Sequence, residues 1–149
     1  MASHDESLPG HDLAGSCVCG SITWHAAGPA RPIIECHCHR CQKITGNHMA
    51  ATAVSNDRLS IDGSTLTWYS PIDDPNVAYG FCGRCGSSLF YRSGVGDGSN
   101  EITSICAGSI DGPSGLEVTE VWWSDHAADH HRLPSTAVVF ETEPDHQSC

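Results

Sequence analysis

Residues Phe81 to Ser87 read FCGRCGS, which is the most specific local motif in this 149-residue sequence. Cys82 and Cys85 are two residues apart and Gly86 follows them, a spacing typical of a zinc knuckle. The tight turn points both sulfurs at one ion, and Gly86 can adopt the positive φ that such a turn needs. Because structural zinc is usually four-coordinate, this pair predicts a second pair elsewhere in the chain.

The second pair lies in SCVCG, where one residue separates Cys17 from Cys19. On an extended strand the two side chains share a face, and Gly20 permits a sharp turn after them. We therefore predict a closed site, the four-cysteine site, made of Cys17, Cys19, Cys82 and Cys85. The alternative is that one of these cysteines is simply a small buried apolar residue.

A third group of cysteines lies in CHCHRC and contains Cys36, Cys38 and Cys41, which we call the cysteine trio. Its three thiols are one short of a closed zinc site. Three protein ligands with an open fourth position are typical of catalytic zinc. The alternative is a second structural zinc site whose fourth ligand is another side chain.

The fourth ligand of the cysteine trio could come from His37, His39 or Glu35. His37, however, alternates with the two cysteines beside it, so on an extended backbone its side chain points to the other face. We therefore favour a water molecule or an external thiol as the fourth ligand.

The ligand type also constrains the chemistry of the cysteine trio. Three thiolates on a divalent ion give a complex of net charge about −1, which is a weaker Lewis acid than a three-histidine site. Hydrolysis by a zinc-bound hydroxide is therefore less favoured. A coordinated thiol is still deprotonated, and its thiolate can attack a carbonyl carbon. The trio thus indicates carbon–sulfur bond chemistry.

The composition excludes several classes of partner and compartment. The nine cysteines are an odd number, so disulfides cannot pair them all within one chain. With 7 basic and 18 acidic residues and a net charge of −11, we expect no binding to nucleic acid or to an anionic membrane. No apolar run is long enough to span a bilayer, and the first residues show no signal-peptide core. We expect a cytoplasmic protein.

Short runs of β-branched and aromatic residues alternate with Gly-, Pro-, Asp- and Ser-rich turns, which predicts an all-β domain. The predicted organisation is a flexible leader over residues 1–12, one domain over 13–140 and a polar tail over 141–149. One short helix is possible at 125–132. The predicted strands are 21–26, 33–35, 49–54, 65–69, 77–81, 88–91, 102–107, 117–123 and 136–140.

These motifs, taken in order, give the sequence a family resemblance. GSCVCGSITW (Gly15–Trp24), ECHCHRCQKITG (Glu35–Gly46), FCGRCGSSLF (Phe81–Phe90) and, more weakly, CAGSIDGP (Cys106–Pro113) resemble the glutathione-dependent formaldehyde-activating enzyme family, which shares its domain with centromere protein V. The resemblance covers about residues 13 to 126. Any one motif alone would be weak, whereas the three cysteine motifs in this order are specific.

The resemblance implies a β-tent fold, with short antiparallel strands organised around two zinc ions. One ion falls on the four-cysteine site and the other on the cysteine trio. The named activity of the family joins glutathione to formaldehyde and is classed as a carbon–sulfur lyase. We therefore expect a small thiol and a small aldehyde as substrates, in either direction of the reaction. The alternative is a non-enzymatic zinc-binding module that presents a surface to a protein partner.

Several other residues each allow a structural and a functional interpretation. Cys106 follows an apolar strand and is interpreted as a buried core thiol rather than a redox nucleophile. His126, His130 and His131 are interpreted as part of a solvated polar turn rather than a histidine-rich metal site. Three cations near the cysteine motifs could receive substrate carboxylates or only offset the charge of the thiolates. These cations are Arg40, Lys43 and Arg84.

Overall fold

The fold was analysed in a computed structural model that describes residues 10–145. The all-β expectation is confirmed, because strands dominate and the described residues contain a single α-helix. The strands are β1 (Leu13–Ser16), β2 (Thr23–Ala26), β3 (Ile33–Cys36), β4 (Met49–Ser55), β5 (Leu59–Asp62), β6 (Leu66–Tyr69), β7 (Val77–Cys82), β8 (Ser88–Ser93), β9 (Ile102–Cys106), β10 (Val118–Trp122) and β11 (Val138–Val139), and the helix is α1 (His39–Thr45).

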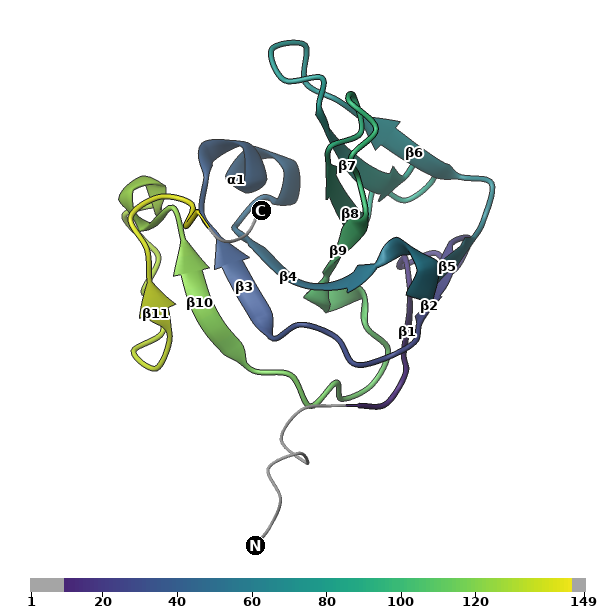
Figure 1. Cartoon of the computed structure of the whole chain (residues 1–149), viewed down its shortest axis with the longest axis horizontal. Helices are drawn as coiled ribbons and strands as arrows, with labels where there is room; N and C mark the ends of the chain where they lie inside the picture. Colours follow the sequence, from purple (N-terminus) through teal and green to yellow (C-terminus); the bar gives the residue numbers. More distant parts are fainter. Residues whose placement is uncertain (1–9, 146–149) are drawn as a thin grey trace, which may run out of the picture.

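The strands form two sheets (Figure 1). The small sheet has the order β1-β2-β5, and the large sheet has the order β11-β10-β3-β4-β9-β8-β7-β6. Most neighbours are antiparallel, as expected, but β10 pairs in parallel with both β3 and β11. Residues 107–117 connect β9 to β10 across the sheet, so that β10 lies beside β3 and runs in the same direction. This crossover brings the C-terminal part of the chain next to the cysteine trio.

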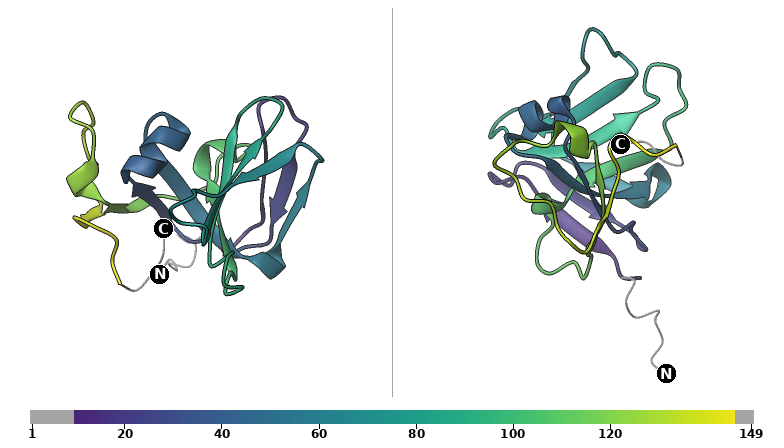
Figure 2. Two further views of the ribbon diagram at one scale, coloured as in Figure 1. Left: turned by 90° about the horizontal axis from the view of Figure 1, so that it is seen from above. Right: turned by 90° about the vertical axis from the view of Figure 1, so that its left-hand side faces the viewer.

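The two faces of the large sheet bury two separate apolar clusters. Successive side chains of a strand point to opposite faces, so Phe90 packs in one cluster and Tyr91 in the other. Ile105 and Cys106 divide in the same way on β9. Figure 2 shows the small sheet on one side of β6 to β9, and α1 with β10 on the other. We call these the small-sheet cluster and the helix-side cluster.

Helix α1 was not expected, because seven residues are too few to show a helical periodicity. Its ends carry local signals instead. The sulfur of Cys38 accepts a hydrogen bond from the amide of Cys41 at the N-terminus, and Gly46 ends the helix with a left-handed φ of 83°. The short helix considered for residues 125–132 is only a 3₁₀ turn, η4 (Ser124–His126).

All nine predicted strands are present with shifted ends, and β1 and β5 are additional.

Of the predicted leader, residues 1–9 lie outside the described part of the chain, as do residues 146–149 of the predicted tail, including Cys149. Residues 140–142 form backbone hydrogen bonds with the segment that follows β10, where the amide of Ser124 donates to Phe140. No helix in residues 10–145 is long and apolar enough to cross a membrane.

Candidate metal centres

The structure brings together the four cysteines of the predicted four-cysteine site. Their sulfurs all lie within 4.8 Å of one another, although Cys19 and Cys82 are 63 residues apart. The sulfur of Cys19 lies 3.6 Å from that of Cys17 and 3.8 Å from that of Cys82. Four thiolates around one zinc at 2.3 Å are about 3.8 Å apart, so these side chains fit a tetrahedral ion.

Two tight turns present these sulfurs. In the second motif, the amides of Arg84 and Cys85 both donate to the sulfur of Cys82 at 3.4 Å, and Gly86 has the expected positive φ of 82°. The first motif is a turn as well, rather than the extended strand that we expected, because the amide of Gly20 donates to the carbonyl of Cys17. Both pairs are therefore held as knuckles.

Hydroxyl groups around the four-cysteine site favour the thiolate form. Hydrogen bonds from Ser21 and Thr65 lower the pKa of Cys82 to about 5. The hydroxyl and amide of Ser87 lower the pKa of Cys85 to about 7. Because zinc binds the thiolate and competes with protons for it, these hydrogen bonds suit the two cysteines to a metal at neutral pH.

The cysteine trio is also assembled, with its three sulfurs within 4.8 Å of one another. Cys36 ends β3, Cys38 precedes α1, and Cys41 lies in the first turn of α1. Cys36 and Cys41 are buried, whereas Cys38 is partly exposed. The strand-to-helix transition thus gathers three sulfurs within six residues, with Cys38 on the accessible side.

The structure argues against His37 and His39 as the fourth ligand of the cysteine trio. His37 faces away from the sulfurs, as its alternation predicts, and its Nε2 lies 3.3 Å from Oε1 of Glu35. The ring of His39 stacks on His126 at a centroid distance of 4.1 Å. Within residues 10–145, no His, Asp or Glu ligand atom joins the three sulfurs in one group.

The cysteine trio lies in the helix-side cluster, against Met49, Tyr79 and Tyr91. Cys106 is buried in the same cluster, and burial raises the pKa of its thiol to about 12. A buried, protonated thiol agrees with the interpretation of Cys106 as a core residue.

The structure contains a further group of potential metal ligands, and the sequence did not predict that its members lie together. Atoms of Glu35, His37, His48 and His131 lie within 4.8 Å of one another. The side chain of His131 is therefore largely buried rather than solvated as expected, in contrast to that of its exposed neighbour His130. No local spacing signals this group, because His48 and His131 are 83 positions apart in the sequence and meet only through the fold.

The cations near the cysteine motifs divide into two classes. Arg40 forms ion pairs with Asp74 at 3.1 Å and Asp73 at 3.6 Å, so its guanidinium is engaged by the loop before β7. Lys43 and Arg84 are exposed at the surface. None of these three cations therefore forms a preorganised binding site for a substrate carboxylate.

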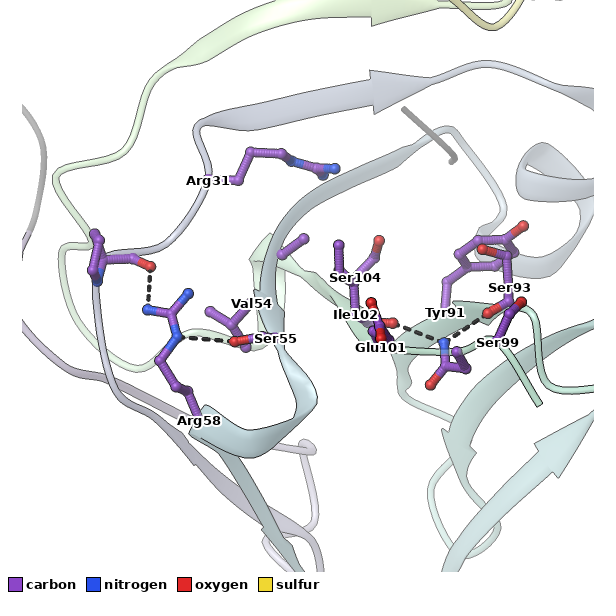
Figure 3. Close-up of a pocket in the computed structure, with 13 residues that line it drawn as sticks. Arg31, Val54, Ser55, Arg58, Tyr91, Ser93, Ser99, Glu101, Ile102 and Ser104 are labelled. Carbon is purple, nitrogen blue, oxygen red and sulfur yellow. Dashed lines mark hydrogen bonds between the residues drawn. The ribbon is translucent and has the colours of Figure 1, made fainter. Parts of the chain in front are cut away.

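A cavity of about 590 Å³ lies beside the helix-side cluster. Figure 3 shows Arg31 and Arg58 on one side of it and Tyr91 and Ser93 on the other. Tyr91 also packs in the cluster that holds the cysteine trio. A second, very small cavity shares Arg31 and Ser104 with the first and reaches Cys36. The small cavity thus lies between the larger cavity and Cys36 of the cysteine trio.

Comparison with known proteins gives a family and a fold. Residues 12–125 match the family model described as glutathione-dependent formaldehyde-activating enzyme. A crystal structure of a Rhodobacter sphaeroides protein is similar with a TM-score of 0.52 and 20% identity, over 67% of this chain and 89% of that one. No curated protein sequence matches the chain. At this identity, the structural likeness shows a shared fold.

Proposed function

Because the chain belongs to the family of glutathione-dependent formaldehyde-activating enzymes, we propose that it adds a small thiol, such as glutathione, to a small aldehyde, such as formaldehyde, or reverses that addition. In the forward direction, a carbon–sulfur bond forms between the thiol sulfur and the carbonyl carbon. The thiol proton ends on the former carbonyl oxygen, so no further reactant is needed.

The proposal is carried by one observation, the three sulfurs of the cysteine trio without a fourth protein ligand among the described residues. Three sulfurs at this spacing suit one zinc ion with one open position. When bound, the ion would supply a substrate thiol in its thiolate form at neutral pH.

The residues around the cysteine trio suit this chemistry. Cys38 is the most exposed of the three cysteines, so the cysteine trio is open to solvent on its side. Met49, Tyr79 and Tyr91 pack against the trio and keep water from its buried side. A site with little water strengthens the attraction between a thiolate and a bound cation, which would offset the cost of burying the thiolate charge.

We assign the larger cavity to the remainder of the thiol substrate. Its volume of about 590 Å³ lies in the range typical of small-molecule sites. Arg31 and Arg58 line it, and their positive charges attract carboxylates such as those of glutathione, while part of each guanidinium already donates to backbone carbonyls. Arg58 is held in place by hydrogen bonds to Ser55 and to the carbonyl of Pro29 (Figure 3).

The reaction can be tested by magnetisation-transfer NMR on a mixture of glutathione, formaldehyde and their adduct, which measures exchange at equilibrium. We expect the protein to accelerate exchange above the spontaneous rate. Cys38→Ser should return the rate to the spontaneous value with an unchanged circular dichroism spectrum, whereas Cys106→Ser should remain active.

The same experiment separates the enzyme from a non-enzymatic interaction module. If the protein is a non-enzymatic module, the unmodified protein should not accelerate exchange between glutathione, formaldehyde and their adduct. A module also predicts zinc X-ray absorption spectra that glutathione does not change. Either result, obtained on protein that contains zinc, would contradict the proposal.

A further inference from the structure

Glu35, His37, His48 and His131 form a compact group on the side of β3 opposite to the cysteine trio, and we call it the histidine–glutamate group. The three imidazoles surround one carboxylate. The Nε2 atoms of His37, His48 and His131 lie 3.3, 3.7 and 3.8 Å from the nearer carboxylate oxygens of Glu35. Three nitrogens and one oxygen therefore converge on one small volume.

The three rings are arranged almost symmetrically. Their centroids are 4.7 Å apart for His37 and His48, 4.6 Å for His37 and His131, and 4.7 Å for His48 and His131. Ligands of a tetrahedral zinc ion at 2.0–2.1 Å are about 3.3 Å apart. The four donor atoms lie within 4.8 Å of one another, so a shared ion requires each of them to move inward by no more than about 1 Å.

Hydrogen bonding alone does not account for this arrangement. The contact between His37 and Glu35, at 3.3 Å, is within hydrogen-bond range. The contacts of His48 and His131 with Glu35, at 3.7 and 3.8 Å, are too long for hydrogen bonds. Two imidazole nitrogens therefore approach the carboxylate without bonding to it, at distances about 0.5 Å longer than those between ligands of a tetrahedral zinc ion.

The histidine–glutamate group is largely buried. His37 is fully buried, and the side chains of Glu35, His48 and His131 are 12%, 14% and 18% exposed. Three imidazolium ions around one carboxylate would leave a net positive charge in a buried place. Neutral imidazoles, the form that binds metals, avoid this unfavourable charge.

The fold holds the three segments of the group in fixed positions. Cys36 pairs with Met49 across β3 and β4, which places His37 and His48 side by side at the end of this strand pair. The segment that carries His131 follows β10, which pairs with β3. The side chain of Gln42 ties this segment to α1, because its amide donates to the carbonyls of His37 and His126, both at 2.7 Å.

We propose that the histidine–glutamate group binds a divalent first-row transition-metal ion, separately from both cysteine sites. Three imidazoles and a carboxylate without sulfur suit zinc, cobalt, nickel or iron(II). The partial exposure of three of the four side chains gives an ion a path from solvent.

The proposal is tested by titrating zinc-loaded protein, purified under reducing conditions, with cobalt(II) and by counting bound metal by mass spectrometry after gel filtration. We expect a third equivalent of metal beyond the two of the cysteine sites. Its binding should not produce the thiolate-to-cobalt charge-transfer absorption that a cysteine site gives.

Two variants and a matched control assign the ion to this group. His131→Ala should weaken binding of the third equivalent by more than about 100-fold, since even partners outside the ligand shell cost 10–100-fold. His130→Ala, one residue away and 74% exposed, should bind as the unmodified protein does. Glu35→Gln keeps the shape of the side chain and should also weaken binding if the His131 variant folds poorly.

Three outcomes would overturn the proposal. The unmodified protein could bind only two equivalents, or His131→Ala and Glu35→Gln could both bind as tightly as His130→Ala. Alternatively, the third equivalent of cobalt could show charge-transfer absorption, which would place it on sulfur. None of these readouts depends on thiol–aldehyde activity, so this inference and the proposed function fail independently.

Discussion

Nε2 of His37 lies 3.3 Å from Oε1 of Glu35, two residues earlier in the chain, while Cys36 between them belongs to the cysteine trio. The alternation of an extended backbone produces this division, because residues 35 and 37 point to one side and residues 36 and 38 to the other. One stretch of four residues thus supplies side chains to two different groups of potential ligands.

Loss of the four-cysteine site should destabilise the whole domain. The buried sulfur of Cys82 connects two knuckles that are far apart in the sequence. We expect Cys82→Ser to lose one equivalent of zinc and more than about 4 kcal/mol of unfolding free energy, the range in which loss of a metal falls. Zinc analysis and urea denaturation measure both. Cys106→Ser, a change of equal size at a buried cysteine outside the metal sites, is the control, and an equal loss there would contradict a role for zinc.

Removal of the Ser21 hydroxyl should shift zinc release to higher pH. Ser21 and Thr65 lower the pKa of Cys82 to about 5, and the Ser21 oxygen lies 3.3 Å from the Cys82 sulfur. In Ser21→Ala the pKa rises, so protons compete with zinc at a higher pH. A chelating dye that reports zinc release during an acid titration gives the midpoint. The exposed Ser60→Ala should keep the midpoint of the unmodified protein, and an unchanged midpoint in Ser21→Ala would refute the role of its hydroxyl.

Cys106 should resist alkylation in the folded protein. Burial raises the pKa of its thiol to about 12, so almost no thiolate is present at pH 8. We expect iodoacetamide to leave Cys106 unmodified in native protein and to modify it after unfolding, as mass spectrometry of peptides can show. Rapid labelling of the native protein, together with loss of activity in Cys106→Ser, would instead support the redox interpretation.

Gly15 should not tolerate a larger side chain. A Cβ atom at this position would lie 2.1 Å from the carbonyl oxygen of Ser109 and 2.4 Å from the ring of Trp24. We expect Gly15→Ala to lower the unfolding free energy by about 3 kcal/mol, the upper part of the range for overpacking. Gly108→Ala, where a Cβ meets nothing within 4 Å, is the control. Urea denaturation compares the two, and equal stability would contradict the close packing at Gly15.

The sequence was most informative where chemistry and local pattern coincide. The cysteine motifs predicted both thiol groups, since short spacings around glycine allow only a few geometries. The β-branched and aromatic runs predicted nine strands. Strand β5 was missed although Leu59, Ser60, Ile61 and Asp62 alternate in burial, because four residues are a weak signal. Strand β1 contains LAGS, whose small residues carry little strand propensity.

The remaining features depend on contacts between distant segments. No spacing predicts that His131 meets His37, because the parallel pairing of β10 with β3 brings them together. For the same reason, Arg40 could be interpreted as a substrate ligand until the loop carrying Asp73 and Asp74 was placed beside it. Helix α1 escaped detection because its N-terminal cap is a cysteine sulfur rather than the usual hydroxyl or carboxylate.

The separation of 63 residues between Cys19 and Cys82 has a consequence for the nascent chain. At 5–20 residues per second, the ribosome needs roughly 3 to 13 s to synthesise the chain from the first knuckle to the second. The cysteine trio lies within a single hexapeptide that emerges during this interval, and closing so short a segment costs little chain entropy. A zinc ion would therefore bind the cysteine trio before the four-cysteine site is complete. Cys17 and Cys19 must stay reduced until Cys82 and Cys85 have been synthesised.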